Sequence, residues 1–340
     1  MRKLNALIAG STGYIGIQLT KLLVKHKKID IKYLCGNSSV GRNIAYYDKL
    51  LLNKKLPKIT KFKKKFLENV DLVFTALPNG EAQNISKFLL KKNVLIDLAA
   101  DFRLNKSSEY FKWYKQKHKA SKKIKKSIYA LPEITGKKVK KFDIIGCPGC
   151  YPTSILLPLV PIVQKKIVST KNIVIDSKSG YSGAGREIHK KNKHKNLYES
   201  LSAYGVGFHR HNAEIEQELK NHTKSDIEFI FTPHLTPMFR GILSTIYVDL
   251  KSGFSINSVI KILKKFYRKN KFIRINKINE PIGTKNVINT NYCEISICES
   301  SIKNKLIILS AIDNLIKGGA GQAVQNMNIR FNYSIEEGLK

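Results

Sequence analysis

A cysteine at the start of an apolar segment is the first group in this sequence that could act as a nucleophile. Cys150 ends the stretch Gly-Cys-Pro-Gly-Cys and is followed by Tyr-Pro-Thr-Ser and a long apolar run. This pattern predicts a helix that begins at Cys150, with Pro152 in the first turn, where proline is favoured. The unpaired N–H groups and the dipole at that helix end favour the thiolate, which is the nucleophilic form of a cysteine.

Two other roles for this cysteine are open on sequence alone. Cys147 and Cys150 have the Cys-x-x-Cys spacing of a redox pair, although Pro-Gly between two thiols also occurs in many ordinary turns. The other role is a zinc site that adds Cys293 and Cys298, but four residues separate these two and no histidine lies at ligand spacing. Cys147 is more simply a buried, inert thiol, and no metal site is predicted.

Two histidines that flank an arginine are the best candidates for proton transfer. The segment 209–217 reads HRHNAEIEQ. Imidazole exchanges protons near neutral pH, and an arginine between two histidines places an anion-binding group beside the proton carrier. Because a lone histidine is more often structural, it is the clustering that favours a catalytic role here.

The few arginines are informative because lysine dominates the basic residues. The chain has 61 lysines and arginines, of which only nine are arginines, and a net charge of +36. Arginine differs from lysine in its planar fork, which grips a carboxylate or phosphate through two hydrogen bonds. Five arginines lie in segments marked by glycine, histidine or proline and are candidates for anionic ligands: Arg42, Arg103, Arg186, Arg210 and Arg240.

A glycine-rich turn near the start of the chain indicates a nucleotide site. Residues 10–16 read GSTGYIG, after an apolar run and before a helical pattern. Such glycines allow a tight turn and let backbone N–H groups approach a pyrophosphate at the helix end. An ordinary strand–helix turn is the alternative.

The end of the second predicted strand indicates which nicotinamide cofactor is preferred. An acidic residue there would bind the ribose 2′-hydroxyl of NAD. The segment 36–42 reads GNSSVGR and has no acid. Ser38, Ser39 and Arg42 could instead receive a 2′-phosphate, so the sequence favours NADP, with an ordinary polar loop as the alternative.

Alternation of apolar strands with helical stretches predicts an α/β protein with a parallel, doubly wound sheet in the first half of the chain. Its strands are expected at 4–9, 31–35, 70–76, 94–98 and 144–145, with a helix at 17–24. Beyond residue 150 the pattern changes to a second, more mixed sheet. Its strands are expected at 173–177, 227–231, 243–250 and 293–298, followed by a C-terminal helix around 323–330.

The composition excludes a wholly disordered basic protein, because 42% of the residues are apolar. The length suggests two domains. The charge fits either a nucleic-acid or membrane partner or a drift in surface composition. A drift in surface composition is favoured, since the lysines are spread along the chain. We find no secretion signal and no apolar stretch of about 18 residues, so we expect a cytoplasmic protein with free thiols and no membrane span.

Together these motifs resemble the N-acetyl-gamma-glutamyl-phosphate reductases of arginine biosynthesis, nearly from end to end. The matching segments are GSTGYIG (10–16), IDLAADFRL (96–104), LPE (131–133), GCPGCYPT (146–153), DSKSGYSGAGR (176–186), HRHNAEIEQ (209–217), TPHLTPMFRGI (232–242) and DNLIKGGAGQAVQNMN (313–328). The Cys-Tyr-Pro-Thr and His-Arg-His segments separate this family from the aspartate-semialdehyde dehydrogenases, which share the fold and the thioester chemistry.

The resemblance implies that NADPH reduces N-acetyl-L-glutamyl 5-phosphate to N-acetyl-L-glutamate 5-semialdehyde with release of phosphate. Cys150 would form a thioester with the acyl group, and His209 would be the acid or base, with His211 in reserve. The implied substrate-binding residues are Arg103, Arg186, Arg210, His211 and Arg240. The implied cofactor contacts are Gly10, Thr12, Gly13, Tyr14, Ile15, Gly16, Ser38, Arg42, Pro78, Gly321 and Gln322.

The resemblance also implies a domain organisation. A Rossmann-type NADP-binding domain would span residues 1–148 and be completed by a C-terminal helix at 311–340. An α+β catalytic and oligomerisation domain of the semialdehyde dehydrogenase type would span 149–310. The partners would be a small anionic substrate and phosphate, with neither nucleic acid nor membrane, in a homo-oligomer (dimer or tetramer).

Some positions and alternatives stay open. Asn79 stands where the family often has a histidine, so the contact made by that loop is not defined. Within the enzyme class, the alternative is a reductase of a neighbouring acyl phosphate, such as aspartyl or aminoadipyl phosphate. From another class, the alternative is a basic nucleic-acid-binding protein that keeps an enzyme fold.

Overall fold

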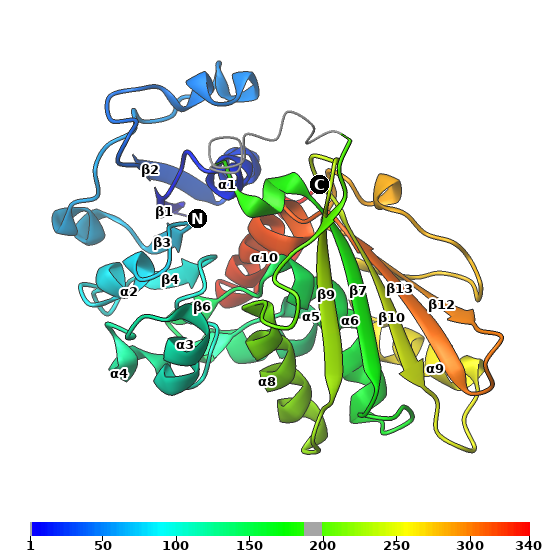
Figure 1. The fold of residues 1–340 in the computed structure, drawn as a ribbon. Helices are drawn as coiled ribbons and strands as arrows, with labels where there is room; N and C mark the ends of the chain where they lie inside the picture. Colours follow the sequence, from blue (N-terminus) through cyan, green and yellow to red (C-terminus); the bar gives the residue numbers. More distant parts are fainter. Residues whose placement is uncertain (1, 187–198) are drawn as a thin grey trace. The chain divides into compact units, whose positions relative to one another are not determined.

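The computed structural model describes residues 2–186 and 199–340, and the chain divides into two compact units (Figure 1). Unit 1 consists of Met1–Pro148 and Gly319–Lys340, and unit 2 consists of Gly149–Gly318. The expectation that the C-terminal helical segment starts at residue 311 is wrong. Strand β13 (Lys305–Ile312) runs on to Ile312, because its apolar residues pair with a neighbouring strand on each side, and residues 311–318 belong to unit 2.

Unit 1 is built on a parallel six-stranded sheet in the order β2-β1-β3-β4-β6-β5. Its strands are β1 (Leu4–Ala9), β2 (Ile29–Cys35), β3 (Leu72–Thr75), β4 (Val94–Asp97), β5 (Ser127–Tyr129) and β6 (Ile144–Gly146). This confirms the predicted parallel α/β arrangement. Strand β5 is not predicted, because three residues beside a lysine run carry no apolar pattern.

Helices connect the strands of unit 1. They are α1 (Tyr14–Val24), α2 (Glu81–Ser86), α3 (Ser107–Tyr114), α4 (Ser121–Ile124), α5 (Pro132–Thr135) and, from the other end of the chain, α10 (Gly321–Arg330). Short 3₁₀ turns lie at Ile44–Tyr46, Lys49–Leu51, Lys64–Asn69 and Gly136–Lys141. The predicted helices at 17–24 and 323–330 are therefore confirmed as parts of α1 and α10.

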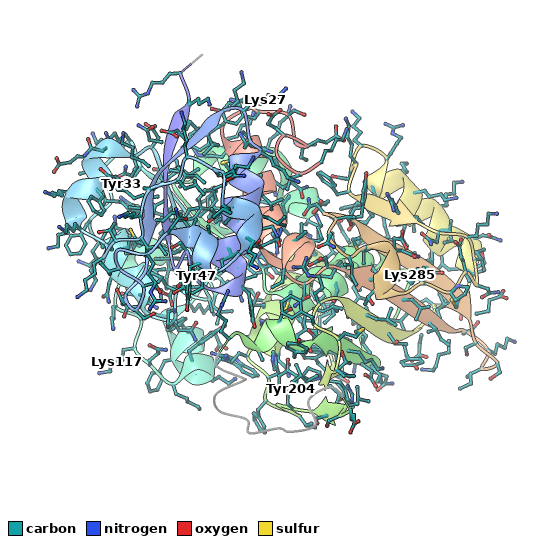
Figure 2. The ribbon with its side chains drawn as sticks, turned by 90° about the horizontal axis from the view of Figure 1, so that it is seen from above. Lys27, Tyr33, Tyr47, Lys117, Tyr204 and Lys285 are labelled. Carbon is teal, nitrogen blue, oxygen red and sulfur yellow. The ribbon has the colours of Figure 1, made fainter. Side chains whose placement is uncertain are left out.

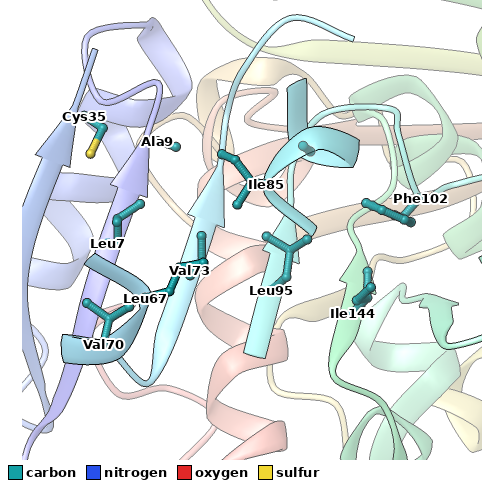
Figure 3. Packing of buried hydrophobic residues seen from close by; sticks show 11 residues of the cluster. Leu7, Ala9, Cys35, Leu67, Val70, Val73, Ile85, Leu95, Phe102 and Ile144 are labelled. Atoms are coloured by element: carbon teal, nitrogen blue, oxygen red, sulfur yellow. The ribbon is translucent and has the colours of Figure 1, made fainter. Parts of the chain in front are cut away.

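The sheet of unit 1 is buried on both faces, which is why its strands read as continuous apolar runs. Every residue of β3 and β4 is buried. Leu7, Val73, Leu95 and Ile144, from four adjacent strands, form one cluster with Phe102 (Figure 3). Each such side chain contributes about 1.5–3 kcal/mol when it is fully buried. This cluster therefore holds in place the strand ends from which the loops of the site emerge.

Helix α10 is held in unit 1 by buried polar contacts as well as by packing. Its residues Gly321 to Asn328 are all buried. The Asn326 side-chain amide donates to the carbonyl oxygen of Ala130 at 2.8 Å. The Gln325 amide donates to the carboxylate of Glu133 at 2.7 Å. Two segments that are far apart in the sequence thus complete one unit.

Unit 2 is built on a mixed seven-stranded sheet in the order β11-β12-β13-β10-β7-β9-β8. Its other strands are β7 (Ile173–Gly180), β8 (Ser202–Ala203), β9 (Phe229–Thr236), β10 (Ile242–Asp249), β11 (Ile273–Ile275) and β12 (Cys293–Glu299). The four predicted strands are confirmed, since they overlap β7, β9, β10 and β12, although β9 begins at Phe229 and β10 ends at Asp249. Strands β8 and β11 are too short to carry a pattern, and the apolar run of β13 fits a buried helix as well as a strand.

The helices of unit 2 gather on one side of its sheet. Helices α6 (Cys150–Gln164) and α9 (Ile256–Tyr267) lie behind the sheet in the view of Figure 1, and α8 (His211–Thr223) packs against α6. Short turns lie at Tyr181–Ala184 and Thr284–Asn286, and a π-helical turn at Ile316–Ala320. The strands alternate accordingly: in β7, Ile173 and Ile175 are buried while Val174 is exposed.

Most of the positive charge of the protein is carried by lysines. Lys27 and Lys117 in unit 1 and Lys285 in unit 2 are exposed examples, labelled in Figure 2. Lys317 is an exception, because its side chain is completely buried. None of the helices within residues 2–186 and 199–340 is both long enough and apolar enough to cross a membrane.

Gly10 should be intolerant of any side chain. Its φ is 85°, and a β-carbon there would lie 2.2 Å from the carbonyl oxygen of Ala76. Gly10→Ala is therefore expected to lower the free energy of unfolding by about 2 kcal/mol or more, as measured by urea denaturation. Gly283→Ala is the matched control, because a β-carbon at that position meets no atom within 4 Å. Equal losses of stability in the two variants would contradict this account.

Candidate active site

The predicted cofactor residues of unit 1 lie at the carboxyl ends of its parallel strands. The turn after β1 and the first turn of α1 carry Gly10, Thr12, Gly13, Tyr14, Ile15 and Gly16. The backbone N–H groups of Gly10 and Ser11 both donate to the carbonyl oxygen of Cys35, which joins this turn to the end of β2. Gly13 is the N-cap residue of α1, so no side chain at this position caps the N–H groups of the first turn. A helix end of this kind can receive a phosphate group.

The loop after β2 carries the residues predicted for a 2′-phosphate. Ser38 and Arg42 are exposed, and the Arg42 guanidinium lies 4.6 Å from the centre of the Tyr46 ring. Stacking of this kind restricts the orientation of the planar guanidinium. Ser39, the other serine considered, is buried and hydrogen-bonded to the hydroxyl of Tyr47. Arg42 and Ser38 are therefore the accessible groups of this loop.

A buried carboxylate that the sequence analysis does not single out holds the loop that contains Pro78. Asp101 accepts hydrogen bonds from the Gly80 N–H at 2.7 Å, the Gln83 N–H at 3.2 Å and the Tyr110 hydroxyl at 2.8 Å. Because charge-assisted hydrogen bonds are the strong ones, they fix the turn that follows β3. The signal in the sequence is an aspartate directly before the Phe-Arg-Leu segment.

A second buried carboxylate lies at the end of β4. Asp97 accepts hydrogen bonds from the Thr75 hydroxyl at 2.6 Å and from the Ala99 N–H at 3.0 Å. Burial, and next the neighbouring charge of Asp101, raise the pKa of this carboxyl to about 7. Asp97 thus ties the ends of β3 and β4 to the loop that leads to Arg103.

Two of the predicted ligand-binding residues of unit 1 contact its own backbone. Arg103 is buried, and its Nε donates to the carbonyl oxygen of Cys147 at 2.7 Å while Nη2 donates to that of Leu98 at 3.0 Å. The Gln322 amide is also buried and donates to the carbonyl oxygen of Pro148 at 3.2 Å. Both side chains therefore hold the backbone of residues 147–148 by hydrogen bonds. Gly321, the residue before Gln322, is the first residue of α10.

All five cysteines are free thiols. Burial raises the pKa of the Cys147 thiol to about 12, which makes it unreactive at neutral pH. Cys293 and Cys298 lie on β12. Across residues 2–186 and 199–340, no three histidine, cysteine, aspartate or glutamate side chains gather as the ligands of a metal ion would.

Cys150 is the first residue of α6, and its side chain is partly exposed. Gly149 is the N-cap residue of this helix, so no side chain at this position caps the N–H groups of its first turn. Gly318, in the π-helical turn Ile316–Ala320, packs against the cysteine, and a β-carbon on it would lie 2.7 Å from the β-carbon of Cys150. The thiol is therefore placed at a helix amino end, with backbone packed closely beside it, as expected for an activated cysteine.

The two histidines of the HRH segment lie around Tyr151, the residue after Cys150. The ring centres of His209 and His211 are 4.7 Å apart, and they lie 5.7 Å and 5.8 Å from the centre of the Tyr151 ring. His211 also packs on Gly149, because a β-carbon there would lie 2.4 Å from His211 Nε2. His211 thus contacts both sequence neighbours of Cys150.

His209 packs against the rings of Tyr151, Tyr204 and Phe231. Burial, and next the charge of Arg210, lower its pKa to about 4. Its ring centre lies 5.5 Å from that of Tyr204, a residue labelled in Figure 2, and the Tyr204 hydroxyl donates to the Tyr151 hydroxyl at 3.1 Å. The sequence analysis misses Tyr204, since no motif marks it. His209 is therefore a neutral imidazole at physiological pH.

The predicted substrate arginines of unit 2 differ in their surroundings. Arg240 Nη1 lies 3.1 Å from the Asp313 carboxylate and 2.6 Å from Asn289 Oδ1, so its guanidinium already has partners within the unit. Arg210 caps α8 and is exposed. Arg186 is partly exposed and follows the turn Tyr181–Ala184. Arg210 is the most accessible of the three to an anion.

Family models and solved structures identify the class of protein to which the chain is similar. Residues 5–142 match the family model described as "Semialdehyde dehydrogenase, NAD binding domain", and residues 150–314 match "Semialdehyde dehydrogenase, dimerisation domain". Aspartate semialdehyde dehydrogenase II of Vibrio cholerae, solved with ASA, has a similar fold, with a TM-score of 0.72 and 16% identity over 98% of this chain and 99% of that one. The enzyme of Candida albicans, solved with NADP, has a TM-score of 0.68 and 17% identity over 96% and 98%. The fold is that of a semialdehyde dehydrogenase, as expected.

Sequence relatives narrow the class to one family. The chain is 42% identical to the N-acetyl-gamma-glutamyl-phosphate reductase of Brachyspira hyodysenteriae, over 98% of this chain and 97% of that protein. It is 43% identical to that of Vesicomyosocius okutanii, over 98% and 96%. It is 40% identical to a probable chloroplastic N-acetyl-gamma-glutamyl-phosphate reductase of Arabidopsis thaliana, over 98% and 83%. The chain belongs to the N-acetyl-gamma-glutamyl-phosphate reductase family of oxidoreductases, which confirms the resemblance found in its motifs.

The lowered pKa of His209 predicts a specific acid sensitivity. The His209 ring should titrate near pH 4 in the folded protein, well below its ordinary value of 6.5. Between these values the unfolded chain binds the proton more readily. Stability that depends on neutral His209 is therefore fully present above about pH 6.5 and is lost as the pH falls towards 4. NMR titration of the histidine rings measures this directly, and a His209 midpoint near 6.5 would contradict the burial of its ring.

Proposed function

We propose that the chain catalyses the NADPH-dependent reduction of N-acetyl-L-glutamyl 5-phosphate to N-acetyl-L-glutamate 5-semialdehyde and phosphate. The observation that carries this proposal is Cys150 at the amino end of α6, with an imidazole packed on the preceding residue. A relative named for this acyl phosphate is 42% identical across nearly the whole chain. The identity favours this substrate over the other acyl phosphates that the same fold can accommodate.

The chemistry uses Cys150 as a covalent nucleophile. Its thiolate attacks the acyl carbon, a carbon–sulfur bond forms, and phosphate leaves with the electrons of the carbon–oxygen bond. NADPH, when bound, supplies the hydride that reduces the acyl group. The tetrahedral adduct on sulfur then collapses to the aldehyde, and the electrons of the carbon–sulfur bond return to the Cys150 thiolate.

His211 is the residue that we propose for proton transfer beside Cys150. It packs on Gly149 and also contacts the Tyr151 ring. His209, which the sequence analysis prefers, has a pKa of about 4 and holds a proton poorly at neutral pH. We therefore assign His209 to the packing of the two neighbouring rings and keep it as the alternative acid or base.

The residues of unit 1 fit a dinucleotide. Gly10 meets the Ala76 carbonyl so closely that no side chain fits, and Gly13 leaves the end of α1 without a side-chain cap. These turns would hold the pyrophosphate, and Ser38 and Arg42 would hold the 2′-phosphate of NADP. Pro78 and Gly321 are further candidates for cofactor contacts. Pro78 lies in the loop that follows β3, and Gly321 is the first residue of α10.

The substrate is an anion at both ends, and arginines are the groups proposed to bind it. Arg210 is best placed because it is exposed beside His209 and His211. Arg186 is proposed as a second contact. Arg103 already donates to the carbonyl oxygen of Cys147, and Arg240 already pairs with Asp313. Either arginine could bind the substrate only in addition to these contacts.

We also propose a homodimer through the exposed face of the sheet in unit 2. Four residues pair directly across adjacent strands and form an apolar row: Ile307, Tyr247, Val174 and Ile230. Ile230, the second residue of β9, is 65% exposed, and Val174, the second residue of β7, is 39% exposed, so both leave apolar surface uncovered on this face. The matching family model is described as a dimerisation domain, and its range contains the whole row. A cytoplasmic location is proposed because all five cysteines are free.

The covalent mechanism predicts that Cys150→Ser abolishes turnover. The assay is the phosphate-dependent reduction of NADP⁺ with N-acetylglutamate 5-semialdehyde, which is the reverse reaction. Serine keeps the shape of the side chain but is a far weaker nucleophile without a base matched to it. The wild-type enzyme should prefer this semialdehyde to aspartate semialdehyde and aminoadipate semialdehyde in kcat/KM. Near-normal turnover of the variant, or equal use of the three aldehydes, would overturn the mechanism or the substrate respectively.

The dimer predicts that a charge in the apolar row shifts the protein to monomers. Ile230→Lys should lower the sedimentation coefficient in analytical ultracentrifugation, because an unpaired charge at an interface is costly. Leu50→Lys is the matched control, since Leu50 is 71% exposed in unit 1 and outside the row. A wild-type protein that sediments as a monomer, or an Ile230→Lys variant that remains dimeric, would rule out this interface.

A further inference from the structure

The helix α6, which carries the candidate nucleophile, is interrupted by two prolines. Pro158 and Pro161 lie inside it, and proline has no N–H group to donate to the carbonyl four residues earlier. The carbonyl oxygens of Ser154 and Leu157 therefore lose their ordinary donors within the helix. The Tyr267 hydroxyl, from α9, donates to the Leu157 carbonyl at 2.5 Å. Groups outside α6 thus help to hold this helix in place.

A chain of buried hydroxyls joins the start of α6 to the sheet of unit 2. Ser154, Ser177 and Ser244 come from α6, β7 and β10, and all three are completely buried. The hydroxyl oxygen of Ser244 lies 2.7 Å from that of Ser154 and 2.7 Å from that of Ser177. The Ser154 hydroxyl also donates to the carbonyl oxygen of Tyr151 at 2.9 Å. The chain therefore ends on the residue that follows Cys150.

The chemistry of the hydroxyl group gives this chain one direction. Each hydroxyl has a single hydrogen to donate. Because Ser154 donates its hydrogen to Tyr151, it accepts from Ser244, and Ser244 in turn accepts from Ser177. Hydrogen bonds that point the same way along a chain strengthen one another. The sheet is thereby connected to the backbone beside Cys150 by hydrogen bonds in series.

Another buried serine lies next to this chain and has a different partner. Ser310 of β13 is paired directly with Ser244 of β10 and is equally buried. Its hydroxyl lies 3.5 Å from the thiol of Cys293 on β12, the strand on its other side. A buried hydroxyl is costly unless it is hydrogen-bonded, so each of these serines needs its partner. Ser310 therefore provides a control for burial without the connection to α6.

We propose that Ser244 is a positioning residue for Cys150. The apolar contacts of α6 favour burial but have no direction of their own, whereas hydrogen bonds fix both distance and angle. Ser244, in the middle of the chain, fixes the start of α6 on the sheet. The thiol is thereby held where the N–H groups of the first helical turn stabilise its thiolate. This inference rests on the proposed function, in which Cys150 is the nucleophile.

The first test removes the central hydroxyl. Ser244→Ala should lower kcat by about tenfold with KM within about threefold of wild type, because a small misplacement of a reacting group costs rate more than binding. Ser310→Ala, which removes an equally buried hydroxyl from the adjacent strand, should keep kcat within about twofold of wild type. A wild-type kcat in Ser244→Ala, or equal losses in the two variants, would overturn the proposal.

The second test asks whether the serines act as one chain. Ser154→Ala, at the α6 end, should lower kcat by about the same factor as Ser244→Ala. The double variant should be hardly slower than either single variant, because the same chain is already broken. Ser154→Ala combined with Ser310→Ala should show the product of their separate factors. Independent effects of Ser154→Ala and Ser244→Ala would contradict a shared chain.

The third test needs no substrate and so separates this inference from the proposed function. Mass spectrometry follows the alkylation of Cys150 by iodoacetamide at about pH 7, below the melting temperature of each variant. The rate should fall about threefold or more in Ser244→Ala and stay at the wild-type value in Ser310→Ala, because only the first variant makes less thiolate. An unchanged rate in Ser244→Ala would overturn the positioning role.

The two hypotheses can therefore fail separately. If Ser244→Ala slows alkylation but the wild-type enzyme does not use the N-acetylated semialdehyde, the inference stands and the assigned substrate is wrong. If the wild-type enzyme uses that semialdehyde but Ser244→Ala changes neither alkylation nor kcat, the proposed function stands and the positioning role of Ser244 is wrong.

Discussion

The close approach of backbone and ring atoms around Cys150 is the constraint on which the site in unit 2 depends. On one side, His211 lies against Gly149 where even a methyl group would overlap with its Nε2. On another, Gly318 packs so closely on Cys150 that a β-carbon has no room. Because protein interiors are packed this densely, the imidazole and the start of α6 have little freedom to separate. The hydrogen bond from the Gly149 N–H to Glu214 also fixes the orientation of the backbone at the start of α6.

In unit 1, buried carboxylates as well as packing hold the loops at the strand ends. A parallel sheet that is buried on both faces leaves its polar chemistry to the loops at the carboxyl ends of the strands. Asp97 and Asp101 lie at those ends and accept hydrogen bonds from backbone N–H groups of the following loops. Burial, and next the charge of Asp101, raise the pKa of Asp97, which shows what it costs to place this carboxyl in the interior. Each loop is thus fixed by groups that themselves have no exposure to a ligand.

The sequence predicts the elements better than it predicts the partners of side chains. Long apolar runs, such as the one that forms β1, identify strands because burial on both faces demands them. Cys150 is found because helix starts have local signals. Arginine is ambiguous: a planar fork suits a ligand, but it suits a backbone carbonyl or an internal carboxylate equally well. Arg103 and Arg240 take these internal partners, and only three-dimensional neighbours reveal it. The choice between His209 and His211 likewise depends on which ring meets Gly149.

The return of α10 to unit 1 has a consequence for the order in which the chain can fold. Residues 319–340 leave the ribosome only after all of unit 2 has been synthesised, yet unit 1 contains them. Unit 2 is continuous in sequence and can begin to fold on its own contacts. Until α10 arrives, the carbonyl of Ala130 and the carboxylate of Glu133 lack the amides that they bind in the native state. Unit 1, most of which is translated before unit 2, is therefore completed only after unit 2 has been synthesised.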